Sequence, residues 1–180
     1  MMSCTIPLGR TGLVALVDSR DYDALAQYTW TARLNPATGS YYAVRAVWVE
    51  RDGRRFRSTI QMAREILGLG SGDPRQADHV DHNTLDNRRV NLRIASRAEN
   101  CRNRRRRSDN VVGYKGVSQM GSRWRAQIWL QGTNVLIGAA FPTPEAAARA
   151  YDERARIEHG AFALVNFPTD PAPAQLPLAA

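Results

Sequence analysis

Alternating apolar and polar residues predict many short strands and few helices in the first seventy residues. Strands are predicted over residues 13–17, 30–34, 41–49 and 54–61, and helices over 18–28 and 62–67. Asp52 and Gly53 separate the last two strands as a hairpin turn would, and Asp18 can cap the first helix. Gly68 ends the second helix, and the residues from there to Pro74 are typical of a linker.

The next segment predicts a strand, a polar loop and a second strand. Residues 75–80 form a short extended piece, and residues 83–89 are rich in turn formers and charge, which is typical of a loop. Val90, Leu92 and Ile94 then alternate with polar residues. We therefore expect a second strand whose three apolar side chains point into a core.

A helix after this hairpin completes the candidate chemistry. Ser96 and Glu99 have the spacing of a capping box, so a helix should start there. That helix would bring the amide of Asn100 toward Asp78 and His79. A carboxylate and an amide oxygen suit an ion such as Mg²⁺, which keeps several waters and completes its shell with a phosphate. The chain has no Cys and His set at zinc-finger spacing. With a pKa near neutrality, His79 could take a proton from an attacking water, so the residues predict phosphodiester hydrolysis.

The run D-H-V-D-H-N-T-L-D-N-R-R-V-N-L-R over residues 78–93, with E-N at 99–100, resembles the HNH endonucleases of the ββα-metal class, especially the homing type of phages. The resemblance implies roles for four residues: His79 as general base, Asn91 as the residue that steadies the loop and the base, and Asp78 and Asn100 as metal ligands. It also implies duplex DNA as substrate and Mg²⁺ as cofactor, with Mn²⁺ as an alternative.

Two positions differ from the pattern of that family. His82 stands where relatives usually have Gly or another small turn residue, and it forms a second Asp-His pair with Asp81. A site built on this pair is an alternative, although its base would lie away from the strand end. Relatives often have a His within a Met-His-Arg run, where this chain has Ala63. A polar loop stabilised by Asx turns, or an ion bound without catalysis, are further alternatives.

The pattern in the last third of the chain predicts three strands followed by a helix. The strands are expected over residues 114–118, 123–130 and 135–141, with turns at 120–122 and 131–134. The middle strand has two unlike faces: Trp124, Ala126, Ile128 and Leu130 against Arg123, Arg125, Gln127 and Trp129. Thr143 and Pro144 predict the helix start, and an Ala-rich stripe should pack on the sheet: Ala147, Ala148, Tyr151 and Ala155. One sheet face would then pack, while the other is available to bind.

This unit resembles the APETALA or ethylene-response-factor type of DNA-binding domain. The resemblance rests on Y-K-G-V from Tyr114, S-R-W-R-A-Q-I from Ser122, Gly138, A-A-A-R-A-Y-D from Ala146 and N-F-P from Asn166. It implies a sheet in the major groove, with five DNA-binding candidates: Lys115, Arg123, Arg125, Gln127 and Trp129. Ser118 stands where plant members commonly have Arg, and Ala139 and Ala140 replace one residue. Base specificity therefore does not transfer.

Charge points to a polyanionic partner. The 180 residues carry a net charge of +8 with a pI near 10.3, and residues 71–110 alone carry +4. An arginine run follows the HNH-like motif and is expected to track DNA phosphates: Arg102, Arg104, Arg105, Arg106 and Arg107. Arginine suits bidentate phosphate contacts, although a GC-rich genome would give the same preference over lysine.

Cys4 and Cys101 are too few and too far apart for a disulfide framework, which favours a reducing compartment. No signal peptide or membrane-spanning run is visible, so we expect a cytoplasmic protein of a bacterial host cell. The expected organisation is α+β: a β-rich region over 1–70, the ββα-metal HNH nuclease motif over 71–103, an arginine-rich linker over 104–111, an APETALA-type domain over 112–168 and a disordered tail over 169–180.

The expected function is a monomeric, phage- or prophage-encoded DNA endonuclease that nicks one strand at a time and needs no protein or membrane partner. The first alternative is a non-catalytic DNA-binding regulator that uses the C-terminal sheet. A second is a protein that binds or cuts RNA, since basic charge and an exposed Trp129 would also suit single strands.

Overall fold

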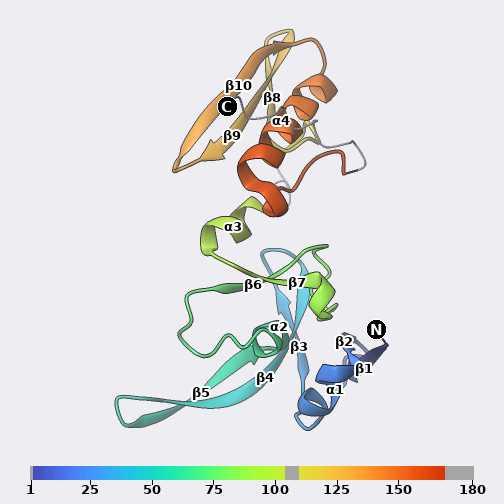
Figure 1. Cartoon of the computed structure of the whole chain (residues 1–180), viewed down its shortest axis with the longest axis vertical. Helices are drawn as coiled ribbons and strands as arrows, with labels where there is room; N and C mark the ends of the chain where they lie inside the picture. The colour runs from blue at the N-terminus through green and yellow to red at the C-terminus, as the bar shows by residue number, and fades with distance from the viewer. Residues whose placement is uncertain (1, 104–109, 169–180) are drawn as a thin grey trace, which may run out of the picture. The chain divides into compact units, whose positions relative to one another are not determined.

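The computed structural model describes residues 2–103 and 110–168 and divides the chain into two compact units, Met1–Ala98 and Glu99–Ala180. Both units combine short helices with small antiparallel sheets (Figure 1), which confirms the predicted α+β class. The predicted tail over 169–180 lies outside the described residues. So do four arginines that are predicted to contact DNA: Arg104, Arg105, Arg106 and Arg107. Within the described ranges, no helix is long and apolar enough to cross a membrane.

The first unit contains β1 (Ser3–Pro7), β2 (Val14–Asp18), α1 (Ser19–Ala26), β3 (Thr31–Asn35), β4 (Ser40–Arg51), β5 (Arg54–Gln61), α2 (Met62–Ile66), β6 (Gln76–His79) and β7 (Leu92–Ala95). Strands β1 and β2 pair, β3, β4 and β5 form a sheet in that order, and β6 pairs with β7. Leu8, Val17, Trp30 and Met62 are buried in one shared core. The Trp30 Nε1–H donates to the Leu25 carbonyl at 2.9 Å, so this large buried ring leaves no unpaired donor.

Three details of this unit differ from the sequence expectations. Strand β1 is not predicted by the pattern. Asp18 lies at the N-cap position of α1 without a side-chain cap bond, and its Oδ2 instead accepts from the Arg89 N–H at 2.9 Å. The inward orientation expected for Val90 and Ile94 is wrong, because they are 81% and 40% exposed, whereas Leu92 is buried as expected. Residues Arg89–Asn91 form a short 3-10 helix, η1, which turns Asn91 inward in place of Val90.

The predicted linker after α2 is fixed by one arginine. The Arg64 guanidinium donates to the carbonyls of Arg75 at 2.7 Å, Gly70 at 2.9 Å and Asp73 at 3.1 Å. These bonds satisfy three loop carbonyls at once, so they hold the segment that leads directly into β6.

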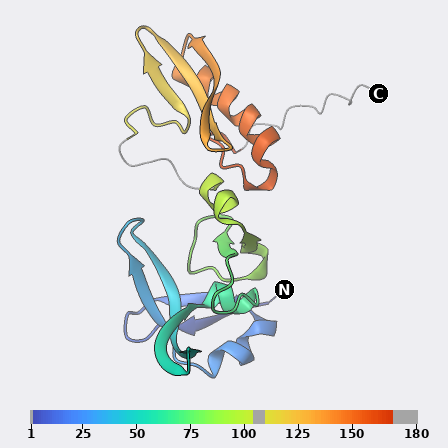
Figure 2. The same cartoon turned by 90° about the vertical axis from the view of Figure 1, so that its left-hand side faces the viewer.

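The second unit contains β8 (Val117–Met120), β9 (Arg123–Leu130), β10 (Thr133–Phe141), α4 (Pro144–His159) and the 3-10 turn η2 (Gly160–Phe162). Helix α3 (Arg97–Arg102) follows β7, as the capping-box position predicts. The sheet order is β10-β9-β8, and α4 lies across one face of it (Figure 2). The predicted stripe is confirmed, because its four members are all buried: Ala147, Ala148, Tyr151 and Ala155. Thr143 caps α4, since its Oγ1 accepts from the Ala146 N–H at 3.1 Å.

Strand β8 begins later than predicted because a tight loop precedes it. Gly116 has φ +76°, and a Cβ there would lie 2.1 Å from the Tyr151 ring. Asn166 holds the same loop, accepting from the Lys115 N–H at 2.6 Å, and buried Asp152 accepts from the Asn166 and Phe167 N–H groups at 2.8 Å each. The N-F-P run therefore closes the unit onto α4 and the start of the sheet.

Candidate nuclease site and nucleic-acid interface

The β6–β7 pair places a buried ion pair next to the candidate base. Asp78 lies opposite Arg93 in the register, and His79 lies opposite Leu92. Asp78 is 6% exposed, and its Oδ2 accepts from Arg93 Nε at 2.7 Å. A buried carboxylate needs such a partner, and this one fixes the rotamer of Asp78 at the end of the strand.

His79 is held by residues from two other parts of the first unit. Its Nε2 lies 3.3 Å from Asn87 Oδ1, and the ring meets Tyr42 edge to face at 6.2 Å between centroids. Asn87 Nδ2 donates to the Leu85 carbonyl at 3.3 Å, so the amide oxygen faces the ring. This arrangement favours the tautomer with the proton on Nε2 and the lone pair on Nδ1.

The electrostatics of His79 favour a neutral ring. Burial lowers its pKa from the usual value, while the Asn87 hydrogen bond and the charges of Asp78, Asp81 and Asp86 oppose that shift. Burial is the larger effect, so it favours the neutral ring, which is the form that can accept a proton.

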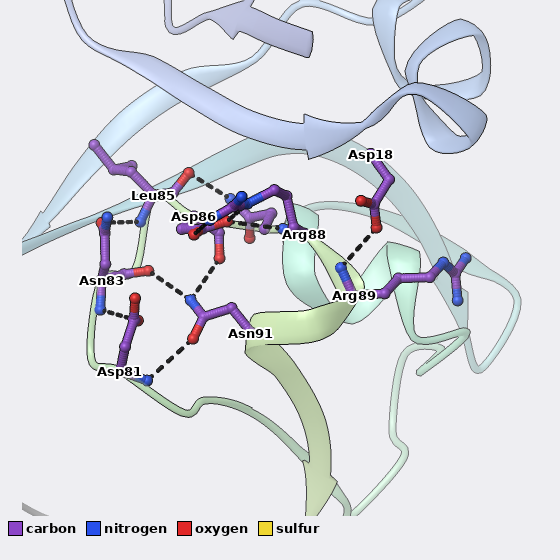
Figure 3. Close-up of polar contacts among 9 residues, drawn as sticks. Asp18, Asp81, Asn83, Leu85, Asp86, Arg88, Arg89 and Asn91 are labelled. Atoms are coloured by element: carbon purple, nitrogen blue, oxygen red, sulfur yellow. Dashed lines mark hydrogen bonds and ion pairs between the residues drawn. The ribbon is translucent and has the colours of Figure 1, made fainter. Parts of the chain in front are cut away.

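Asn91 clamps the loop between the two strands (Figure 3). Its Oδ1 accepts from the Asp81 N–H at 3.0 Å, and its Nδ2 donates to the Asp86 carbonyl at 2.9 Å and the Asn83 carbonyl at 3.4 Å. The Val80 N–H also donates to the Asn91 carbonyl at 2.9 Å. One buried amide thus ties the end of β7 to both ends of the loop, in keeping with the loop-steadying role that the resemblance implies.

The N-terminal strands hold the same loop from the other side. The Leu16 N–H donates to the Leu85 carbonyl at 2.8 Å, and the Asn87 N–H donates to the Leu16 carbonyl at 2.7 Å. Arg89 pairs with Asp21 of α1 at 2.8 Å, beyond its backbone bond to Asp18. Leu16, Asp18 and Asp21 therefore help to place Asn87 against His79.

The structure gives less support to the alternative in which the catalytic pair is Asp81 and His82. His82 has φ +65°, the left-handed conformation that a glycine adopts most easily, and its N–H donates to the His79 carbonyl at 3.1 Å. Asp81 is exposed, and its Oδ1 accepts from the Asn83 N–H at 2.7 Å in an Asx turn. These two residues form the turn, whereas His79 lies at the end of the strand.

The predicted metal ligands lie in different units. Asp78 belongs to the first unit, and Asn100 lies on α3 within the second, so their pairing stays a prediction. No group of three His, Cys, Asp or Glu side chains gathers as a metal site among the residues with described positions. A Mg²⁺-like ion does not need such a group, because one carboxylate, waters and a substrate phosphate can complete its shell.

The second unit presents the predicted binding face. Trp129 is 61% exposed and Arg123 is exposed, while Arg125 and Gln127 are half-buried. The Arg125 Nε–H donates to Ser118 Oγ at 2.8 Å across the β8–β9 pair. Leu136 of β10 pairs with Gln127 and is 59% exposed, so it extends this face. The strand register thus adds Ser118 and Leu136 to the residues of this candidate binding face.

Two other basic residues contact protein groups. Lys115 Nζ donates to the Arg102 carbonyl at 2.6 Å, and burial lowers the Lys115 pKa to about 8. Arg45, which lies on β4, donates to Glu65 at 2.7 and 2.9 Å and stacks over the Tyr28 ring at 3.8 Å. The half-buried Arg45 is therefore bound to other residues of the first unit.

Sequence reasoning does not single out Asn87, Tyr42 or Arg93. Asn87 lies in the L-D-N-R run and has the residue type of a positioning amide, which is the available signal. Tyr42 lies 37 positions before His79 in the sequence, so only the fold brings the two rings together.

No protein-family model matches the chain. The chain is 35% identical to an uncharacterized HNH endonuclease of Acanthamoeba polyphaga mimivirus, over 49% of this chain and 46% of the relative. It is 50% identical to an AP2/ERF and B3 domain-containing protein of Oryza sativa subsp. japonica, over 31% of this chain and 15% of the relative. It is 34% identical to an ethylene-responsive transcription factor of Medicago truncatula, over 47% of this chain and 32% of the relative. The chain thus spans less than half the length of each, and its similarities fall into two classes.

Proposed function

We propose that this protein is a metal-dependent HNH endonuclease that binds duplex DNA and nicks it by phosphodiester hydrolysis. The observation that carries the proposal is the buried His79, which Asn87 orients on a loop clamped by Asn91, and which follows the buried carboxylate Asp78 at the end of β6. The partial similarity to an HNH endonuclease supports the same chemistry.

In this mechanism His79 is the general base. Asn87 Oδ1 holds Nε2 of the ring at 3.3 Å, and the imidazole takes a proton from the attacking water. The water oxygen forms a bond to phosphorus as the bond to the leaving oxygen breaks, and that oxygen takes a proton from solvent. Asn91 acts on the loop alone, since its amide contacts backbone groups.

A bound divalent ion would neutralise charge on the scissile phosphate and on the leaving oxygen. Asp78 fits this role, because a carboxylate is a hard oxygen ligand and Arg93 orients it at the strand end beside His79. Asn100 is the predicted second ligand. Mg²⁺ is the expected ion, with Mn²⁺ able to replace it.

The second unit supplies DNA binding in this proposal. Its sheet face exposes Trp129 and Arg123 opposite α4, and the plant relatives named above are a transcription factor and a protein with an AP2/ERF domain. The same observation favours one second candidate function, a DNA-binding regulator in which the first unit does not cut.

Cleavage of a labelled plasmid by paired histidine variants tests the proposal. We expect His79→Ala to abolish Mg²⁺-dependent nicking without loss of DNA binding, and His82→Ala to keep it within a fewfold of wild type. If both variants lost nicking equally, the assignment of the general base would shift from His79 to the Asp81–His82 pair. Binding without nicking by the wild type would favour the regulator.

A further inference from the structure

One face of the β3-β4-β5 sheet gathers arginines around an exposed tryptophan. The register places Trp48 opposite Arg57, Glu50 opposite Arg55, and Tyr42 opposite Arg33. Cross-strand partners and alternate residues share a face, so these side chains project from the same side of the sheet. We call the surface formed by Arg33, Trp48, Arg55 and Arg57 the Trp48 face.

The side chains of the Trp48 face are mostly exposed. Trp48 is 64% exposed, and all three arginines are exposed. The Arg55 guanidinium lies over the Trp48 ring at 5.4 Å, and Arg33 Nη1 donates to Thr59 Oγ1 at 3.3 Å. Glu50 is the one acidic side chain that the described register adds to this side of β4 and β5. An exposed aromatic ring among basic groups is the composition of a nucleic-acid surface.

The same side of the sheet leads to the candidate base. Tyr42 lies six residues before Trp48 on β4, and its ring contacts His79. At roughly 3.3 Å per residue, Trp48 lies about 20 Å along the strand from this contact. Phosphates advance about 3.4 Å per base pair along each DNA strand, so this span corresponds to about six base pairs. Figure 1 shows β4 and β5 as one long hairpin.

The described side chains on the opposite side of the hairpin do not lead to His79. It carries exposed Arg54 and Phe56, but nearer the core it holds Arg45 bonded to Glu65. Arg54 therefore has the charge and exposure of Arg57 without the connection to His79.

We propose that the Trp48 face binds the sugar–phosphate backbone of duplex DNA beside the cut site, within about six base pairs of the scissile phosphate. Arg33, Arg55 and Arg57 pair with phosphates, and Trp48 packs against sugars. The proposal rests on the proposed nuclease function, because His79 sets the position of the duplex. Under it, the cutting unit holds its own substrate in addition to the contacts of the second unit.

The test measures binding by the full chain to a fluorescent 30-base-pair duplex of random sequence, in EDTA, across a salt series. The variants are Arg57→Glu and its matched control Arg54→Glu, which change charge equally on opposite faces. We expect Arg57→Glu to weaken binding about tenfold and to lower the slope of log K against log salt by about 1, while Arg54→Glu changes binding less than about threefold. Melting curves confirm that both variants fold.

Equal weakening by the two variants would overturn the proposal, because net charge alone would explain it. Unchanged binding in Arg57→Glu would overturn it as well. The readout in EDTA does not depend on cutting, so failure of the nuclease proposal is seen separately. If wild type never nicks DNA but Arg57→Glu alone loses binding, the face stands as a DNA surface and the nuclease proposal fails.

Discussion

Replacing Asn91 by alanine should increase local opening of the loop at the candidate site while the first unit stays folded. The substitution removes two short hydrogen bonds, from the Asp81 N–H at 3.0 Å and to the Asp86 carbonyl at 2.9 Å, and a longer one to the Asn83 carbonyl. Each short bond contributes about 1 kcal/mol, and a buried partner left unsatisfied costs about 1–3 kcal/mol. Because the Asp86 carbonyl bond is buried and the other two are partly buried, we expect a loss of about 2–3 kcal/mol.

Hydrogen exchange read by mass spectrometry is the assay, because it resolves the two units and the loop separately. A loss of 2–3 kcal/mol corresponds to about 30- to 150-fold faster exchange for amides in residues 80–91. Nicking should fall with it, because Asn87 would no longer hold His79. Asn91→Asp should cost at least as much, since a carboxylate oxygen would face two carbonyls.

Asn134→Ala is the matched control, because this exposed asparagine lies in the second unit. It should change exchange in the loop by less than about 0.5 kcal/mol. Wild-type protection of residues 80–91 in Asn91→Ala would refute the clamping role of Asn91 and the positioning of His79 through this loop.

Three further outcomes concern the second unit. Gly116→Ala should destabilise it by about 3 kcal/mol, because the new Cβ would meet the Tyr151 ring at a positive φ; a selective loss of hydrogen-exchange protection in residues 117–155 would show this. The half-buried Lys115 has a folded pKa of about 8, below the 10.5 of an exposed lysine, so the unfolded chain binds more protons between these values. The free energy of unfolding should therefore rise with pH from about 8 to 10.5. Denaturation of Lys115→Met across this range should lack that rise. Arg125→Ala should weaken duplex binding by about 1–3 kcal/mol in a mobility-shift titration, with the nicking rate at saturating protein unchanged.

Local patterns predict much of the fold. The alternation in β9 gives both its bounds and its two faces, and the Thr143-Pro144 pair gives the start of α4. The predicted inward orientation of Val90 is wrong, because the short helix η1 rotates the chain so that Asn91 is buried instead. A single helical turn before a four-residue strand leaves no periodicity to detect.

The candidate site is only partly predictable for a related reason. The residue types of Asp78, His79 and Asn91 and their spacing mark the motif, but their supports come from distant parts of the chain. Asp18 accepts from Arg89 across 71 positions, and the Tyr42 ring reaches His79 from another sheet. Such contacts depend on tertiary packing, and a local sequence window holds no signal for them.

In the proposed function, His79 acts with a divalent ion to cut DNA. The most direct measurement is conversion of supercoiled plasmid to the open-circular form by wild type and His79→Ala, with Mg²⁺ and with EDTA, at concentrations where both proteins bind equally. We expect open circles only from wild type with Mg²⁺, and none from wild type in EDTA or from His79→Ala. Plasmid that stays supercoiled with bound wild-type protein and Mg²⁺ or Mn²⁺ would contradict it, and so would nicking that survives in His79→Ala.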